Sequence, residues 1–210
     1  MLHYEEIKAT EADARHLMIV LHGLGDSLEG YRFLPSMLNC PWLNYALVNA
    51  PDPYFGGFSW YDIQGDTHPG VVRSRGLLFE LLDHFRNEGY PSRNIFLLGF
   101  SQGCLMTWES GMRYPHELAA CVGISGAIHQ VDNLIAEASP VAVKQHFLIT
   151  HGHLDPIIPL APVKEDVDKV ITKGFDVEWR DFMKEHTIAG GEELGVIQEF
   201  VTKHRQNSSD

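Results

Sequence analysis

The sequence predicts an α/β protein with a mostly parallel central sheet and helices on both faces. Short, continuously apolar runs recur along the chain, as in strands that are covered on both sides. Longer amphipathic stretches lie between these runs, and such alternation implies crossover connections and a parallel sheet. The chain has 210 residues, 44% of them hydrophobic, which is enough for one large core without metals or disulfides as staples.

Six runs are expected to be strands: residues 16–21, 45–48, 94–100, 121–125, 146–150 and 175–180. Four stretches between them are expected to be helices: residues 71–85, 102–113, 160–173 and 192–204. Gly89 and Pro115 mark the ends of the first two helices, and Gly174 is a C-cap for the third. We therefore expect a single domain over residues 1–204, followed by a polar tail over 205–210.

Charge and cysteine content exclude several classes of function. With 16 basic and 28 acidic residues the net charge is −12, so phosphate backbones and anionic lipid surfaces repel the chain, and no nucleic-acid partner is expected. The wide spacing of Cys40, Cys104 and Cys121 argues against a disulfide framework. The first residues of the sequence lack the pattern of a signal peptide, and no apolar run reaches the ~20 residues of a membrane span. We expect a cytoplasmic protein without stable membrane insertion. The sequence does not determine the oligomeric state, and a homodimer is compatible with it.

The candidate nucleophile is Ser101. It lies in Gly99-Phe100-Ser101-Gln102-Gly103, a G-x-S-x-G motif between an expected strand and an expected helix. The sharp turn brings backbone segments close together, so a side chain at either glycine would collide with a neighbour. An ordinary glycine-rich turn is the alternative, and partner residues must decide between the two.

A serine nucleophile needs a histidine base and an acid that orients it, in the chain order Ser, Asp or Glu, His. Asp155 follows the end of an expected strand, and His186 lies between the last strand and the last helix. Reactive groups in such folds lie beyond the C-terminal ends of the strands. Other acids and His204 fall within helices, within the last strand or near the tail. The expected triad is Ser101, Asp155 and His186.

The motif His151-x-His153-x-Asp155 also resembles a cluster of metal ligands. One short loop does not by itself define a metal site, and no second cluster at ligand spacing appears elsewhere in the sequence. We therefore expect neither a metal nor a cofactor, and His151 and His153 are interpreted as residues that shape the loop.

The motif His22-Gly23-Leu24-Gly25 follows the first strand, where a glycine-flanked loop can turn a backbone N–H toward Ser101. In serine hydrolases of this kind one oxyanion donor is the N–H after the nucleophile, and the other comes from an early strand–helix loop. These donors are expected to be the main-chain N–H groups of Gln102 and Leu24, so the backbone path matters more than the side chains.

The sequence resembles the small carboxylesterases of the α/β-hydrolase fold, a group that includes acyl-protein thioesterases and lysophospholipase-like esterases. The resemblance covers nearly the whole chain. It rests on the motifs LHGLGD (21–26), NAP (49–51), WYD (60–62), GFSQG (99–103), HGHLDPIIP (151–159) and the stretch 186–193. It implies the same catalytic and oxyanion residues, and an acyl pocket flanked by the loop around Trp60 and by Ile157.

Two positions depart from the family pattern. Cys104 stands where many relatives have glycine, and we expect a small buried thiol there with slightly altered packing. Glu185 stands where many relatives have glycine before the histidine, which adds a carboxylate near His186 and leaves the shape of that loop open.

Three functions are compatible with these residues. The main expectation is a serine carboxylesterase that hydrolyses short- to medium-chain acyl esters through an acyl-enzyme, because the chain has no room for a large lid domain. Residues 52–70 are the best candidate for a partial cover, although most of their aromatic rings are expected to pack on the core. The first alternative is an acyl-protein thioesterase or lysophospholipase acting on long acyl chains. The second is a catalytically silent binding protein of the same fold.

Overall fold

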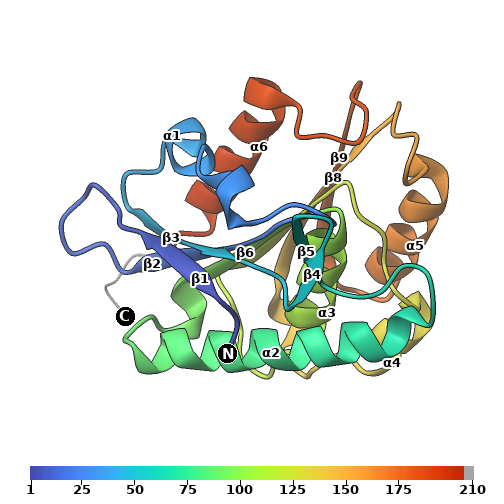
Figure 1. Ribbon diagram of the computed structural model, residues 1–210, viewed down its shortest axis with the longest axis horizontal. Coiled ribbons are helices and arrows are strands. Elements are labelled where there is room, and N and C mark those ends of the chain that lie inside the picture. Colours follow the sequence, from blue (N-terminus) through green and yellow to red (C-terminus); the bar gives the residue numbers. More distant parts are fainter. Residues whose placement is uncertain (206–210) are drawn as a thin grey trace.

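The structure is a computed structural model that describes residues 1–205, so the expected polar tail, apart from Arg205, lies outside the described residues. The described residues form a seven-stranded sheet with the strand order β1-β3-β2-β6-β7-β8-β9 (Figure 1). Its strands are β1 (Tyr4–Ile7), β2 (His16–Leu21), β3 (Leu43–Val48), β6 (Ile95–Phe100), β7 (Ala120–Ile124), β8 (His146–Gly152) and β9 (Asp176–Phe182). All are parallel to their neighbours except β1, which pairs antiparallel with β3. The predicted mostly parallel sheet is confirmed.

Helices cover both faces of this sheet (Figure 1). They are α1 (Leu34–Leu38), α2 (Thr67–Asn87), α3 (Gln102–Arg113), α4 (Val131–Ala136), α5 (Leu160–Thr172) and α6 (Gly190–Lys203). Single 3₁₀ turns lie at η1 (Leu28–Tyr31), η2 (Ser92–Asn94) and η3 (Ala142–Lys144). Side chains of α2, α3, α4 and α5 pack in the core on one face, and those of α1 and α6 pack on the other.

The continuously apolar strands follow from this two-sided cover. Along β2, Leu17 and Ile19 enter the core beneath α2 and α3, whereas Met18 and Val20 enter the core beneath α1 and α6. Successive side chains of a strand point to opposite faces, so a strand covered on both faces has no polar side.

Five short elements were not predicted from the sequence. They are β1, α1, α4 and the two strands of a separate hairpin, β4 (Asp52–Tyr54) and β5 (Gly57–Ser59). The helices α1 and α4 have five and six residues, too few for a helical period to show. Strand β1 lies at the sheet edge and reads Tyr-Glu-Glu-Ile, so it lacks the apolar run that marks the inner strands.

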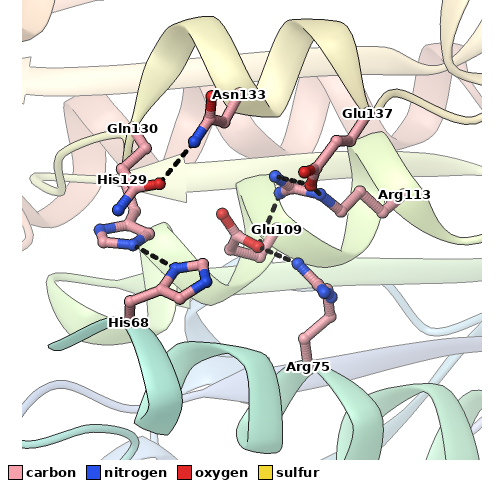
Figure 2. Close-up of polar contacts among 8 residues, drawn as sticks. All are labelled: His68, Arg75, Glu109, Arg113, His129, Gln130, Asn133 and Glu137. Atoms are coloured by element: carbon pink, nitrogen blue, oxygen red, sulfur yellow. Dashed lines mark hydrogen bonds and ion pairs between the residues drawn. The ribbon is translucent and has the colours of Figure 1, made fainter.

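A buried carboxylate ties three helices together on one side of the sheet (Figure 2). Glu109 of α3 is 1% exposed. It accepts hydrogen bonds from Arg75 of α2 at 2.8 Å and from Arg113 at 2.7 Å. Arg113 also reaches Glu137, just after α4, at 2.9 Å. Because α3 begins directly after Ser101, this network helps to hold in place the helix on which the candidate nucleophile depends.

Cys40, Cys104 and Cys121 are all buried and free. No helix in the described part of the chain combines the length and the apolar character needed to cross a lipid bilayer.

Candidate active site

Ser101 occupies a strained turn between β6 and α3. Its backbone has φ 55° and ψ −114°, a region that side-chain-bearing residues rarely adopt and that occurs mostly at functional sites. A Cβ at Gly99 would lie 2.1 Å from the carbonyl oxygen of Gly103, and one at Gly103 would lie 2.1 Å from that of Leu21. Only glycine fits at these two positions because neighbouring backbone segments lie so close, as the sequence predicted.

The three predicted catalytic side chains meet at the C-terminal edge of the sheet. Nδ1 of His186 lies 2.7 Å from Oδ2 of Asp155, and Nε2 lies 2.9 Å from Oγ of Ser101. An ionised carboxylate only accepts, so Nδ1 carries the proton and Nε2 is free to accept from the hydroxyl. This is the arrangement in which an imidazole can remove the serine proton.

Asp155 is oriented by its own loop after β8. Its Oδ1 accepts from the N–H groups of Ile157 at 2.9 Å and Ile158 at 2.8 Å. Burial alone would raise the pKa of Asp155, but the N–H of Ile158, the His186 ring and the N–H of Ile157 together bring that pKa below its ordinary value. The carboxylate thus stays ionised beside the imidazole.

The loop after β2 carries the candidate oxyanion donor Leu24, and His22 fixes its path. His22 is fully buried; its Nε2 accepts from the N–H of Ala50 at 3.0 Å, so Nδ1 donates to the carbonyl of Gly23 at 2.6 Å. Burial lowers the pKa of His22, which keeps the ring neutral for this pairing. Within residues 1–205, the N–H groups of Leu24 and Gln102 have no acceptor in the protein.

Gln102 contributes more than its backbone. Its side-chain Oε1 accepts from the N–H of Trp60 at 2.9 Å, and its Nε2 donates to the carbonyl of Tyr61 at 2.9 Å. The buried amide therefore fastens the loop after β5 to the turn that carries Ser101. The sequence does not predict this contact, because a glutamine in a catalytic motif gives no sign of where its side chain points.

Trp60 does not fit the substrate-contacting position expected for it. Its side chain is 0% exposed and its Nε1 donates to the carbonyl of His22 at 2.9 Å. The ring fills the core beneath the oxyanion loop, so it presents no face to a ligand. Ile157, by contrast, is 69% exposed and adjoins the Asp155 loop.

The two departures from the family pattern have clear structural outcomes. Cys104 is buried beneath the turn, where Gly123 and Gly126 leave it space: a Cβ at either would lie within 2.6 Å of its side chain. Burial raises the pKa of the Cys104 thiol to about 12, so it is an inert packing group. Glu185 is exposed, and its carbonyl closes a tight turn by accepting from the N–H of Thr187 at 2.8 Å.

The neighbour of Glu185 points inward. Lys184 is 5% exposed, and its Nζ lies 2.5 Å from Oε1 of Glu193, which is 0% exposed. Oε2 of Glu193 accepts from the N–H of Ala189 at 2.6 Å. This buried pair thereby ties both sides of the His186 loop to the start of α6. The sequence does not predict this pair, because lysine and glutamate are almost always exposed.

The residues of the His151-x-His153-x-Asp155 motif diverge. Nε2 of His151 donates to the carbonyl of Ile158 at 2.8 Å and lies 3.7 Å from Oδ2 of Asp155, whereas His153 faces Asp181. In the part of the chain that the structure describes, no group of three or more His, Cys, Asp or Glu residues is arranged to hold a metal ion. The histidines instead shape the loop that presents Asp155.

Comparison with known proteins places this geometry in a family. Residues 2–205 match the family described as phospholipase/carboxylesterase. The chain belongs to this family. Acyl-protein thioesterase 1 of Schizosaccharomyces pombe is 33% identical over 155 residues, covering 68% of this chain and 69% of that protein. Acyl-protein thioesterase 1 of Yarrowia lipolytica is 27% identical and covers 89% of this chain and 91% of its own.

A solved structure of the esterase PE8 superimposes with a TM-score of 0.85 at 28% identity, covering 96% of this chain and 98% of that one. The phospholipase/carboxylesterase family therefore supplies both the α/β-hydrolase fold and the enzyme class. The protein is a serine hydrolase of the carboxylic ester hydrolase class.

Proposed function

We propose that this protein is a serine carboxylesterase that hydrolyses short- to medium-chain acyl esters through an acyl-enzyme intermediate. The observation that carries the proposal is the hydrogen-bonded series from Ser101 Oγ through His186 to Asp155, with distances of 2.9 and 2.7 Å. The backbone N–H groups of Leu24 and Gln102 beside it are the proposed oxyanion donors.

Ser101, His186 and the two N–H groups have different roles in the reaction. His186 Nε2 takes the hydroxyl proton while Ser101 Oγ bonds to the ester carbonyl, and the two N–H groups stabilise the negative oxygen that forms. The C–O bond to the alcohol then breaks, and His186 gives its proton to the departing oxygen. In the second half, His186 takes a proton from water as the water oxygen bonds to the acyl carbon. The bond from that carbon to Ser101 Oγ then breaks, and His186 returns the proton to Oγ, which releases the acid and restores Ser101.

The acyl length is part of the proposal. Trp60 and Tyr61 fill the interior beneath the 52–70 loop, so this loop offers little space for a long buried acyl channel. Ile157, 69% exposed beside the Asp155 loop, is proposed as an apolar contact for a shorter acyl chain on the open surface.

A thioesterase acting on long acyl chains is a second candidate, favoured by the likeness to two acyl-protein thioesterases. A series of p-nitrophenyl esters from acetyl to palmitoyl separates the two candidates. We expect kcat/KM to peak at the short to medium esters. A steep continued rise toward palmitoyl would favour the thioesterase and contradict our proposal.

Replacement of the nucleophile tests the chemistry itself. We expect Ser101→Ala to lower kcat on p-nitrophenyl butyrate by about 10⁴-fold or more, because no other group can carry the acyl intermediate. A fluorophosphonate should label wild-type protein on the peptide that contains Ser101 and should not label the variant. Ser92→Ala, a matched change in η2 before β6, should keep full activity. Retained turnover in Ser101→Ala would refute the proposed mechanism.

A further inference from the structure

A groove runs along the face of the molecule that carries α1 and α6, and it ends at the catalytic histidine. Its volume is about 320 Å³, at the lower end of the ~300–1,000 Å³ typical of small-molecule pockets. Besides His186, its walls are mostly apolar and comprise Tyr31, Phe33, Met37, Phe100, Ile188 and Leu194. The acyl pocket expected from the sequence lies elsewhere, beside Trp60 and Ile157.

The floor of the groove consists of buried side chains, and its rim consists of exposed apolar side chains. Tyr31 and Leu194 are each 3% exposed, whereas Phe33 is 40% and Met37 51% exposed. Apolar side chains that remain uncovered at the edge of a concave site mark it as a binding surface. The aromatic ring of Phe33 stacks on that of Tyr31 with centroids 6.2 Å apart, so the rim is held by the floor.

The charge of the groove limits what it can bind. Its lining includes one carboxylate, Asp26, and no lysine or arginine. Asp26 already accepts from the N–H of Ser27 at 2.7 Å. An anionic group in this groove would face Asp26 without a cation, in a protein of net charge −12, so an uncharged apolar group is favoured.

The position of His186 indicates whether the acyl group or the leaving group of the substrate lies in this groove. The His186 ring packs on Phe100 with centroids 5.0 Å apart, and its Nε2 faces Ser101. In acyl transfer the same Nε2 must protonate the departing oxygen or sulfur. The leaving group therefore lies against His186, and the groove is the apolar space that begins at that ring.

We propose that this groove is a subsite for the leaving group of the substrate, an uncharged apolar alcohol or thiol. The proposal rests on the proposed function and extends it to substrate class. It predicts selection on the alcohol side of the ester that is independent of the acyl chain, and discrimination against leaving groups with a nearby phosphate or carboxylate.

Ethyl and hexyl butyrate test this, because both have the same acyl group and a primary alcohol of similar leaving ability. We expect kcat/KM for hexyl butyrate to exceed that for ethyl butyrate by roughly ten-fold or more, from the methylenes buried in the groove. A 5-carboxypentyl butyrate, which adds a carboxylate at the end of a similar chain, should lose that gain.

Met37→Glu places a charge on the rim and should bring the hexyl-to-ethyl ratio close to one. Val143→Glu is the matched control: Val143 is 56% exposed in η3, before β8 and so away from the C-terminal strand ends, and it should keep the wild-type ratio. The ratio for ethyl octanoate against ethyl butyrate reports on the acyl side, and it should be equal in wild type and Met37→Glu.

Two results would overturn the proposal. One is equal kcat/KM for hexyl and ethyl butyrate in the wild type. The other is a loss in Met37→Glu confined to the octanoate ratio, which would make the groove an acyl site. Failure of the proposed function has a different signature: no ester in the series would be hydrolysed, and Ser101 would not be labelled by a fluorophosphonate.

Discussion

At the scale of single residues, the convergence of the candidate catalytic side chains was easier to predict than the packing around them. Ser101, Asp155 and His186 were selected by motif and chain order, and Gly99 and Gly103 by the steric demands of the turn. The role expected for Trp60 was wrong, because an aromatic ring in a loop near an active site fits a pocket wall and a core position equally well. Only its 0% exposure decides between them.

The Gln102 side chain gives a prediction at this scale. Gln102→Leu preserves the size of the side chain but leaves the Trp60 N–H without its partner and removes one of the two hydrogen bonds to the Tyr61 carbonyl, which keeps the Ser59 hydroxyl. Unpaired buried polar groups of this kind cost about 1–3 kcal/mol each. We expect urea unfolding to show a loss of about 2 kcal/mol or more, together with a lower kcat/KM as the turn loosens.

The control for this change is Gln198→Leu, a matched substitution on α6 whose amide makes one long contact of 3.4 Å with the carbonyl of Asn39. Surface changes of this type usually stay within about 0.5 kcal/mol. Equal stability of the Gln102 and Gln198 variants would show that the Gln102 amide does not hold the loop.

At the scale of elements, the loop between β9 and α6 is held by contacts at several points. Lys184 Nζ and the Ala189 N–H both reach Glu193, and the Lys184 carbonyl accepts from the N–H of Leu154 at 3.0 Å. The loops that carry His186 and Asp155 are thereby joined. Burial lowers the pKa of Lys184, although the charges of Glu193 and Asp155 oppose that shift.

Removal of one partner of this buried pair should be more harmful than removal of both charges. Lys184→Met leaves Glu193 buried and unpaired, a change that costs about 3–5 kcal/mol. In the double variant Lys184→Met/Glu193→Gln no net charge is buried, and the glutamine oxygen can still accept from Ala189. We expect the double variant to recover most of the lost stability in thermal unfolding.

Catalysis should follow the same order. In Lys184→Met we expect kcat on p-nitrophenyl butyrate to fall with KM little changed, because Lys184 and Glu193 hold His186 in position and do not themselves line the groove proposed to bind substrate. The downfield proton resonance of His186 Nδ1–H against Asp155 should weaken in the single variant and return in the double one. A single variant as stable as the double would contradict a paired role for Lys184 and Glu193.

The elements themselves were predicted in proportion to their length and burial. The helix 102–113 and the strand 16–21 were predicted with the bounds now observed, Gln102–Arg113 and His16–Leu21. The long helix α2 begins at Thr67, four residues before its expected start, because the Asp66 cap, whose side chain accepts from the N–H of His68, lies outside the apolar period. The edge strand β1 and the short helices α1 and α4 have too few buried side chains to leave a period in the sequence.

At the scale of the whole molecule, the parallel sheet explains why the sequence could predict that Ser101, Asp155 and His186 lie together. The loops after β6, β8 and β9 leave the same edge of the sheet, and neighbouring strands in the order β6-β7-β8-β9 bring distant residues together there. The groove beside His186 was not predictable in this way, because it depends on how α1 and α6 pack against each other. Helix α1 leaves no periodic signal, so its packing partner could not be inferred.

Buried and half-buried histidines make the stability of the molecule depend on pH. His204, at the end of α6, packs against the rings of His146 and Phe200 with centroids 4.1 and 4.6 Å away. Burial, and then the nearby His146 and Lys203, lowers the pKa of His204 to about 4. The unfolded chain would protonate this residue near its ordinary pKa of about 6.5.

Between those two pKa values the unfolded state binds a proton at His204 and the folded state does not. The free energy of unfolding therefore decreases as the pH falls from about 6.5 to about 4, and the His204 contribution is fully present above that window. His22, His129 and His151 act in the same direction, because burial lowers the pKa of each.

His204→Gln removes one of these linked protons. We expect urea unfolding to show a shallower loss of stability for this variant than for the wild type as the pH is lowered from about 7 to about 5. His3→Gln, a matched change of an exposed residue, should reproduce the wild-type pH dependence. If the His204 variant instead runs parallel to the wild type at every pH, the ring contacts of His204 stabilise the fold only by packing, and the pH dependence must come from the other buried histidines.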